Sequence, residues 1–464
     1  MPDNTSAAVP TEDKLDFRRV GPVLFIVFID LMGLTILIPI LPYYALSFNA
    51  GTAVIGMLVA SYPLMQFISG PILGALSDRF GRKPVLAIAQ VGTFLSLLML
   101  GFANALWMIF LARILDGITG ANLPTAQAAI SDITTPKNRS QGLGLIGAAF
   151  GVGFIIGPAI SAGALALSGN NYSAPAFVAA AFAFTSVILT TFVFKETLPP
   201  EKRNARNGNR RQTGALAFGS MLRGLRNPVL GVLFLLVFLQ QNVFGAFQSM
   251  FAPFTLTRLG LNSLGNTVFF VFFGVILAVV QGGLIGPLTQ RFGERRLVYT
   301  GLGLISAGLI LMSFAPTLPV PWYERTALIE ELEGQSETGA VLSENQLALL
   351  PPDEERGVSV LIYLLLVIGI VPVGIGLLQP SINSLITQRV SPQEVGEALG
   401  VNAAFFSLAN VLGPLWGGAA FDFIAPFAPF LIGGVISGGL VFLAFWRVKP
   451  IERETPSPVP APGD

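Results

Sequence analysis

The sequence contains no cysteine and no histidine among its 464 residues. Without cysteine, the chain can form no disulfide, no thiolate metal site and no thiol nucleophile. Without histidine, it lacks the side chain that most often carries a proton near neutral pH. Any proton chemistry must therefore use carboxylates.

Charged residues are few, at 11% of the chain, whereas 53% of the residues are hydrophobic and the mean hydropathy is +0.70. This composition indicates an integral membrane protein. The net charge of +1 gives no sign of a nucleic-acid partner. The sequence has no Gly-x-x-x-x-Gly-Lys-Ser/Thr loop, which argues against an ATP-driven pump. No pattern predicts an enzyme, a cofactor or a metal site.

Long apolar runs divide the chain into twelve candidate membrane spans, since about 20 apolar residues cross a bilayer core of about 30 Å. A helix satisfies its own backbone hydrogen bonds in lipid, so the predicted fold is all-α. The spans begin near Val20, Val54, Pro84, Ala105, Gln141, Ala174, Val229, Gly265, Leu297, Val358, Glu397 and Pro426.

Lysine and arginine lie mostly in alternate loops, and short cytoplasmic loops accumulate these residues. Placing the N-terminus inside leaves only Arg258, Arg325 and Arg356 outside. The even span count then places both termini in the cytoplasm, with residues 1–19 and 448–464 as tails. No cleavage site follows the first span, so we expect this span to remain in the mature protein.

The spans form two bundles of six, at residues 20–194 and 229–447, joined by a linker at residues 195–228. The linker holds eight basic residues and two glutamates, as expected of a cytoplasmic connector. Its last part, residues 216–226, interleaves leucine with arginine. This part predicts either an interfacial helix on anionic lipid or an extended tether.

An acidic stretch at residues 317–357 separates the ninth and tenth spans. It has nine acidic residues and two arginines, a net charge of −7, which suits an extracytoplasmic loop. Residues 328–350 have a helix-forming composition. The stretch therefore predicts a mobile loop or a small external cap, and the mobile loop is the simpler expectation.

Two pairs of matching segments indicate that the halves are repeats. Residues 74–84 read GALSDRFGRKP and residues 286–296 read GPLTQRFGERR, with an offset of 212. Residues 131–136 match residues 387–392 with an offset of 256, and the difference is close to the length of the acidic stretch. Parallel six-span repeats are typical of one large transporter architecture, whose substrate site lies at the repeat interface.

These segments resemble the major facilitator superfamily, in particular its twelve-span drug/proton antiporters, which include the tetracycline exporters. Residues 74–84 match the superfamily's signature loop, and residues 113–120 resemble its fourth-span arginine motif. Residues 30–42 resemble the first span of tetracycline-type exporters. The fifth-span antiporter motif is matched at Gly144, Gly153, Gly157 and Pro158, whereas Ser161 and Ala162 replace its usual glycine pair.

The candidates for proton coupling are Asp30, Arg113 and Asp116. Asp30 lies about 15 Å into the first span at about 1.5 Å per residue, where an ionised carboxylate is costly. Arg113 and Asp116 share one helix face, and the family usually has a neutral residue in place of Asp116. Either Asp116 is a constant partner of Arg113 while Asp30 binds the proton, or the arginine alternates between the two carboxylates. A permanent structural hydrogen bond of Asp30 is the alternative.

The signature loop is a candidate cytoplasmic gate between the halves. Asp78 is expected to accept hydrogen bonds from a helix N-terminus in the other half, and Arg82 is expected to reach Asp132. A loop that only orients two spans by its positive charge is the alternative. The predicted gate residues are Gly74, Asp78, Arg79, Gly81, Arg82, Lys83 and Asp132.

In the fifth span, the glycines permit close helix packing and the proline favours a bend, so this span either seals the cavity or only packs. Arg389 and Asp422 are expected at the cytoplasmic edges, which confines coupling to the first half. The candidate substrate wall is polar but uncharged, among 37 phenylalanines, and suits an amphipathic or aromatic compound. It comprises Gln127, Gln241, Gln248, Gln281, Gln379 and Asn383.

The resemblance implies proton-coupled secondary active efflux (antiport) of a small amphipathic organic compound or drug, such as a tetracycline-like one, by alternating access. It also implies a monomer in the bacterial inner membrane, with protons and the lipid bilayer as further partners. A metabolite facilitator or a proton symporter of the same superfamily is the alternative. A receptor that does not transport would have no use for buried charges, which are costly in a membrane.

Overall fold

The computed structural model is all-helical over the residues it describes. Its long helices have 20 to 29 residues, which span about 30 Å or more at about 1.5 Å per residue. The described residues are 17–120, 122–134, 139–198, 216–227, 230–334, 342–353, 355–390 and 395–448.

The N-terminal half forms six membrane-crossing segments. The fourth segment is divided into two helices, α5 and α6, which meet at Gly120. The helices are α1 (Phe17–Leu37), α2 (Leu41–Leu46), α3 (Thr52–Phe80), α4 (Arg82–Gly101), α5 (Leu106–Thr119), α6 (Asn122–Ile133), α7 (Arg139–Leu167) and α8 (Ser173–Phe192).

The C-terminal half forms six further crossing segments, of which the second contains a π-helical turn, η2. The helices are α11 (Gly231–Leu259), α12 (Ser263–Val279), η2 (Val280–Leu284), α13 (Ile285–Phe292), α14 (Glu294–Ser313), α15 (Arg325–Gly334), α16 (Glu344–Leu347), α17 (Ser359–Thr387), α18 (Val395–Phe423) and α19 (Ala428–Arg447).

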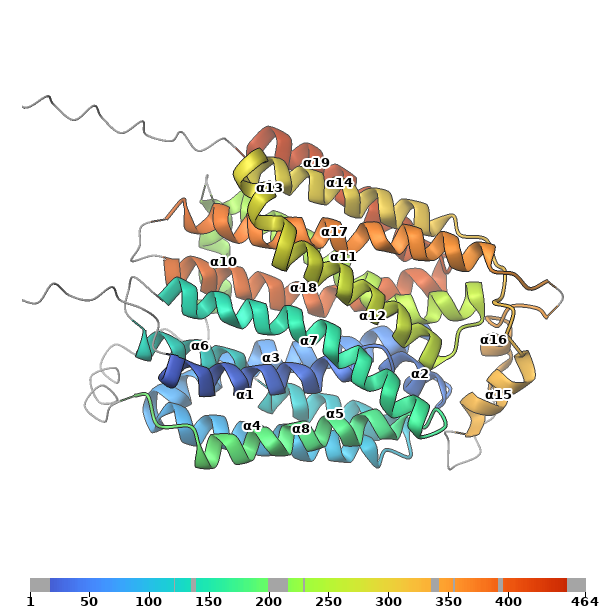
Figure 1. Ribbon diagram of the computed structural model, residues 1–464, viewed down its shortest axis with the longest axis horizontal. Helices are drawn as coiled ribbons and strands as arrows, with labels where there is room; N and C mark the ends of the chain where they lie inside the picture. The colour runs from blue at the N-terminus through green and yellow to red at the C-terminus, as the bar shows by residue number, and fades with distance from the viewer. Residues whose placement is uncertain are drawn as a thin grey trace, which may run out of the picture.

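The two halves lie side by side with their helices roughly parallel to the long axis (Figure 1). Each predicted span begins within three residues of the helix that is found, so the twelve-span, two-bundle prediction is confirmed. Ten helices are long and apolar enough to cross a membrane by themselves. The α5–α6 pair and α7, which has a shorter apolar part, complete the twelve.

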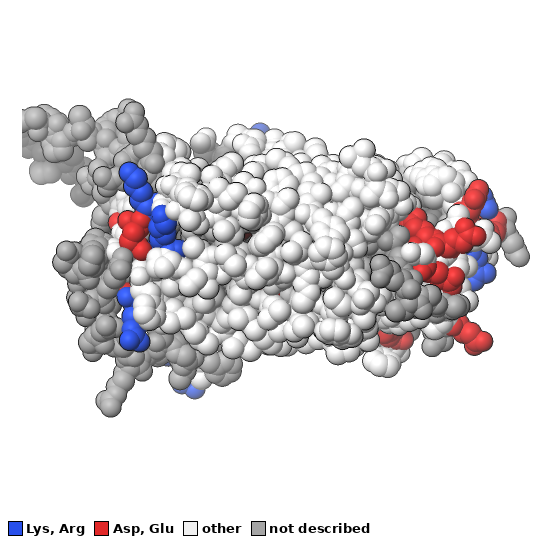
Figure 2. Space-filling view, turned by 90° about the horizontal axis from the view of Figure 1, so that it is seen from below, with Lys and Arg blue, Asp and Glu red and all other residues white. Residues whose placement is uncertain are grey.

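Charge separates the two ends of the bundle (Figure 2). At one end, which we call the basic end, arginine and lysine gather where α3 meets α4 and where α13 meets α14. The other end, which we call the acidic end, carries α15 and α16. An almost uncharged band lies between them, as expected for a surface in contact with lipid.

A single large apolar core joins the halves at the acidic end. It includes Tyr43 and Ile55 from the N-terminal half, and Phe254 and Phe430 from the C-terminal half. At the basic end, the N-terminal half has a separate, smaller core, whereas the large core continues within the C-terminal half as far as Met221 and Phe234. The halves are therefore packed together at the acidic end and have separate cores at the basic end.

Glycines allow α3 and α18 to cross closely at the acidic end. A Cβ at Gly56 would lie 2.3 Å from the carbonyl oxygen of Pro414, and one at Gly418 would lie 2.5 Å from that of Thr52. A Cβ at Gly70, further along α3, would meet nothing within 4 Å. The helices thus touch near Gly56 and leave space near Gly70.

Asp422 lies at the acidic end and not at the cytoplasmic edge predicted for it. It accepts hydrogen bonds from the Thr52 hydroxyl and, at 2.7 Å, from the Ala53 backbone N–H. An anion is favoured at this N-terminus of α3. The prediction was wrong because α18 runs from the basic end, so its last turn, which holds Asp422, emerges at the acidic end.

Two further predictions concern segments outside the twelve spans. The acidic stretch is not a simple mobile loop, because its described part forms α15 and α16 and packs on both halves. The end of the linker forms a helix, α10 (Leu216–Arg226), in place of an extended tether. Met221 of α10 is buried, whereas Arg223 and Arg226 are exposed.

We expect Gly56→Ala to lower the free energy of unfolding by about 1–3 kcal/mol, because its methyl group would push α3 away from α18. Gly70→Ala is the matched control on the same helix. It should be neutral or stabilising by up to about 1 kcal/mol, since alanine is the better helix former. Denaturant unfolding in detergent measures both, and equal effects would contradict the close crossing.

Candidate functional site

Asp30 and Ser186 form a polar contact inside the N-terminal half. Asp30 lies on α1, and its Oδ1 accepts a hydrogen bond from Ser186 Oγ on α8 at 2.8 Å. Ser186 is fully buried and Asp30 is partly buried. The carboxylate that was predicted from sequence thus lies between helices and not on the lipid face.

Arg113 and Asp116 form a buried ion pair one turn apart on α5. Arg113 Nη1 lies 2.9 Å from Asp116 Oδ2, and each residue is 5% exposed. Desolvating two charges is costly, and their attraction compensates only in good geometry. Neutralising either residue would leave the other as a buried charge without its partner, which would favour a change in the contacts of the remaining charge.

Tyr62 of α3 is a site residue that the sequence analysis missed. Its ring centre lies 4.4 Å from Arg113 Cζ, within cation–π range. The only sequence signal was polar Tyr62 and Gln66 four residues apart within an apolar run.

At the basic end, Arg82 is the centre of a cluster of hydrogen bonds. Its side chain is 3% exposed and lies 2.7 Å from Asp78 and 3.0 Å from Asp132, so the predicted contact with Asp132 is present. It also donates to Ser77 Oγ at 2.6 Å, and its backbone N–H donates to Glu196 at 2.9 Å. Sequence reasoning missed Ser77 and Glu196.

Glycine at position 81 is required by the backbone, because its φ is +106°. Gly293 has the same place in the second half and a φ of +77°. The Arg79 side chain is exposed and stacks on Phe80, outside the cluster. Lys83 is half-buried, and its backbone N–H donates to Glu196 Oε2 at 3.3 Å. A Cβ at Gly74 would meet nothing within 4 Å, so this glycine is not needed for packing.

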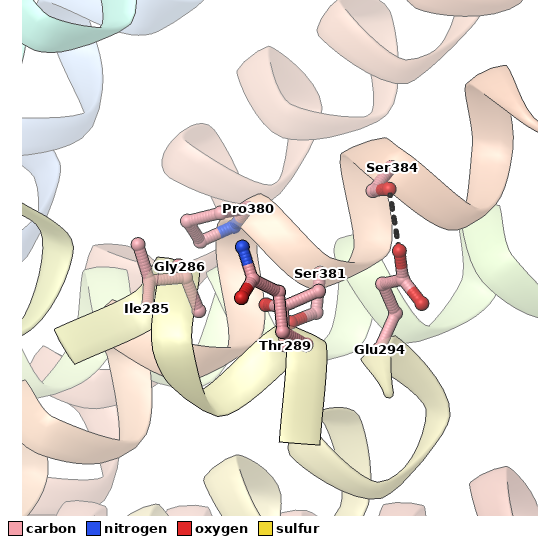
Figure 3. Close-up of a pocket in the computed structure, with 8 residues that line it drawn as sticks. Ile285, Gly286, Thr289, Glu294, Pro380, Ser381 and Ser384 are labelled. Carbon is pink, nitrogen blue, oxygen red and sulfur yellow. Dashed lines mark hydrogen bonds between the residues drawn. The ribbon is translucent and has the colours of Figure 1, made fainter. Parts of the chain in front are cut away.

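The second half repeats the geometry with the opposite charge. Glu294 stands where the first half has Arg82, and it accepts hydrogen bonds from Ser384 Oγ at 3.2 Å and Gln388 Nε2 at 2.9 Å. Figure 3 shows Ser384 directed at this carboxylate. Beside it lies an open pocket of about 380 Å³, lined by Ile285, Gly286, Thr289, Gln290, Glu294, Pro380, Ser381 and Ser384.

The fifth-span glycines bring α7 against α1. Thr35 Oγ1 donates to the carbonyl of Gly153 at 2.9 Å, and a Cβ at Gly157 would lie 2.0 Å from the same hydroxyl. Pro158 follows within α7. The surroundings of Gly144 lie outside the described residues.

Three amides join in the C-terminal half. Gln241 Nε2 donates to Asn410 Oδ1 at 3.0 Å, and Gln379 Nε2 donates to Gln241 Oε1 at 3.3 Å. Asn410 was not predicted from sequence. Gln281 lies across the interface between the halves, because its Oε1 would be 3.3 Å from a Cβ at Gly151.

The remaining predicted wall residues do not join this amide cluster. Asn383 is exposed and accepts from Asn402 at 3.1 Å. Gln248 and Gln127 are partly buried on α11 and α6. The structure thus brings together Gln241 and Gln379 of the predicted set, and leaves the others apart.

Two six-helix bundles, with buried charges in one half and an amide cluster in the other, define a membrane transporter built from repeats. The family model of the Major Facilitator Superfamily matches residues 23–331 and 340–463. The chain therefore belongs to this superfamily.

Relatives of known name match along much of the chain. Multidrug resistance protein 2 of Bacillus subtilis (strain 168) is 27% identical over 425 residues, covering 91% of this chain and 94% of the relative. Tetracycline resistance protein, class B, of Escherichia coli is 32% identical over 294 residues, covering 63% of this chain and 71% of the relative.

Solved structures share the fold. The human organic anion transporter MFSD10 superposes with a TM-score of 0.63 at 21% identity, covering 92% of this chain and 99% of that one. The nucleoside transporter NupG superposes with a TM-score of 0.64 at 15% identity, covering 94% and 100%.

We expect Arg82→Gln to lower the free energy of unfolding by about 2–3 kcal/mol, because it removes a buried charge whose two partners keep some solvent contact. Arg79→Gln, which alters the exposed arginine of the same loop, should change it by less than about 0.5 kcal/mol. Thermal and denaturant unfolding in detergent distinguish them. An equal loss in both variants would show that Arg82 contributes only surface charge.

Proposed function

We propose that the protein is a proton-coupled exporter of small amphipathic organic compounds that works by alternating access. The observation that carries this proposal is the set of buried charges in the N-terminal half, Asp30 with Ser186 and Arg113 with Asp116. Buried charges inside a membrane bundle are costly and mark proton or ion pathways. With no histidine in the chain, the two carboxylates are the proton carriers.

Proton binding would alter a different contact at each carboxylate. If Asp116 takes the proton, the arginine loses its 2.9 Å partner and turns to another anion. If Asp30 takes it, the Asp30–Ser186 contact weakens while the ion pair persists. In both cases, proton binding changes the side-chain contacts where α1, α3 and α5 meet.

The substrate would bind against the amides and rings of the C-terminal half. Gln241 presents both donors and acceptors there. Phe244, Phe247 and Phe273 lie with ring centres 5.9–6.3 Å apart, and Phe154 of the N-terminal half joins Phe273 at 6.3 Å. Aromatic walls with few amides suit an apolar or aromatic solute that carries some polar groups.

The basic end is the cytoplasmic end in this proposal, because cytoplasmic loops accumulate lysine and arginine. The described N-terminal and C-terminal helices, α1 and α19, begin and end there. Both termini then lie on the cytoplasmic side of a bacterial inner membrane in this proposal. The structure then has its external side closed. A single chain forms the site, so we propose a functional monomer.

The names of the relatives support the substrate class. Proteins named for multidrug resistance and for tetracycline resistance are similar to this chain over most of its length or over its larger part. Tetracycline and ethidium, which are planar and amphipathic, are therefore the probes to use first.

We expect everted membrane vesicles to take up tetracycline or ethidium when a proton gradient is applied, and an uncoupler to abolish uptake. Asp30→Asn should reduce uptake to the uncoupled level. Asp116→Asn should do the same if Arg113 alternates between carboxylates, and should preserve coupling if Asp116 is only a structural partner. The control is Asp353→Asn, an exposed residue at the acidic end.

Other outcomes would redirect the proposal. Uptake that ignores the uncoupler would indicate a facilitator, and proton flow in the same direction as the substrate would indicate a symporter. Unchanged coupling in both Asp30→Asn and Asp116→Asn would remove these carboxylates from the mechanism.

A further inference from the structure

We propose that Tyr62 is the positioning residue of the coupling site and holds the Arg113 guanidinium toward Asp116. This role presupposes the proton-coupled export proposed above. The Tyr62 ring covers one face of the guanidinium at 4.4 Å, while Asp116 binds one edge at 2.9 Å. Arginine stacked on an aromatic ring is held in a defined plane.

Neighbouring groups hold Tyr62 in place. Gln66 Nε2 donates to the Tyr62 hydroxyl at 3.2 Å and to the carbonyl of Gly120 at 3.0 Å. A Cβ at Gly117 would lie 2.5 Å from the Tyr62 carbonyl oxygen, so α5 rests on the α3 backbone at this turn. The ring therefore keeps its position relative to both helices.

The ring biases the choice of Arg113 between two carboxylates. Among the described residues, buried Arg113 Nε has no hydrogen-bond partner, so one edge of the guanidinium is available for a second anion. Turning toward Asp30 would cost the stacking on Tyr62, so the ring favours Asp116 until Asp116 binds a proton.

The test compares Tyr62→Phe, which keeps the ring, with Tyr62→Leu, which removes it. Proton-driven uptake of tetracycline into everted vesicles is measured from pH 6 to 8 in both variants, with tetracycline binding in detergent as the check of folding. We expect Phe to stay within about twofold of the wild type and Leu to lose about tenfold, with a displaced pH profile.

Equal uptake and equal pH profiles for the Phe and Leu variants would overturn the role of the ring. If the Leu variant does not bind tetracycline, Tyr62→Met, which is also non-aromatic, takes its place in the comparison. Wild-type uptake that ignores an uncoupler would overturn proton coupling itself, and with it this role. If uptake by the wild type is proton-coupled but the Tyr62 variants behave like the wild type, only the role of Tyr62 is overturned.

At the acidic end, Glu331 of α15 joins the two halves through one carboxylate. Its Oε2 accepts from Asn170 Nδ2 and from Asn262 Nδ2, each at 3.1 Å, and its Oε1 accepts from the Tyr172 hydroxyl at 3.0 Å. Asn170 and Tyr172 belong to the N-terminal half, and Asn262 to the C-terminal half. Burial, with the nearby Glu331 carboxylate, raises the pKa of Tyr172 well above its usual range, so its hydroxyl remains a donor.

The rest of the acidic-end cap is also anchored to both halves. Leu328 and Leu332 of α15 are buried in the core that the halves share. Gln346 of α16 donates to the carbonyls of Leu46 and Ala50 in the N-terminal half, at 3.4 and 3.2 Å. Opening the acidic end would have to break contacts of both α15 and α16.

We infer that α15 is an interlock, meaning an element that must release its bonds before the acidic end can open. The superfamily match stops at residue 331 and resumes at 340. The acidic stretch at residues 317–357, which contains α15, is close in length to the excess of the second half over the first. The interlock would slow exposure of the transport pathway at this end.

The natural absence of cysteine permits a direct test. Ala53→Cys places one thiol beside Asp422, at the crossing of α3 and α18. We expect Glu331→Gln in this background to speed its labelling by a membrane-impermeant maleimide about tenfold, because charge-assisted hydrogen bonds across the halves are lost. Glu330→Gln, an exposed neighbour on the same helix, is the control and should leave the rate unchanged.

Unchanged labelling in Glu331→Gln would overturn the interlock. A lower thermal unfolding midpoint with no change in labelling would also overturn it, since α15 would then be only a stabilising cap. If Glu331→Gln does not fold, Asn262→Leu, which removes the bond to the C-terminal half from the other side, must give the faster labelling. This outcome is independent of proton coupling and of Tyr62.

Discussion

The structure depends on one apolar core that both halves share at the acidic end. Lipid is as apolar as these side chains, so close packing and interhelical hydrogen bonds hold the halves together, and exclusion from lipid contributes little. Gly56 and Gly418 permit that closeness, and Asp422 adds its hydrogen bonds to the start of α3. At the basic end, the N-terminal half has a core of its own, separate from the core of the C-terminal half. One end of the interface can therefore change while both bundles stay intact.

Most of the fold could be predicted from the sequence, because the bilayer restricts what a backbone can do. Apolar runs of sufficient length had to become helices, and the positions of the breaks followed from charge and turn residues. The helical cap at residues 325–334 was only the second of two alternatives, since an acidic, polar composition does not reveal packing partners. The misplaced Asp422 shows a different weakness: assigning a residue to one end requires following the direction of its helix.

The candidate site was predicted in part. Arg113, Asp116 and Asp30 stood out because charge is rare in apolar runs, and Arg82 with Asp132 followed from the family resemblance. Tyr62 did not stand out, since one aromatic ring in an apolar span looks like any other until the arginine above it is seen. The roles of these residues in coupling remain predictions that the transport experiments must test.

Two close crossings, of α3 with α18 and of α7 with α12, lie near the middle of these helices or nearer to their acidic ends. A Cβ at Gly274 of α12 would meet the backbone of Phe154 on α7 at 2.7 Å, so at this second crossing too there is no room for a side chain. The two halves are in close contact at these two crossings, which are the points about which they can rotate relative to each other. Because the helices extend far past these points toward the basic end, a small rotation at the crossings becomes a large displacement there. The size of the displacement at the basic end thus depends on the length of the helices and on the few glycines that permit the close crossings.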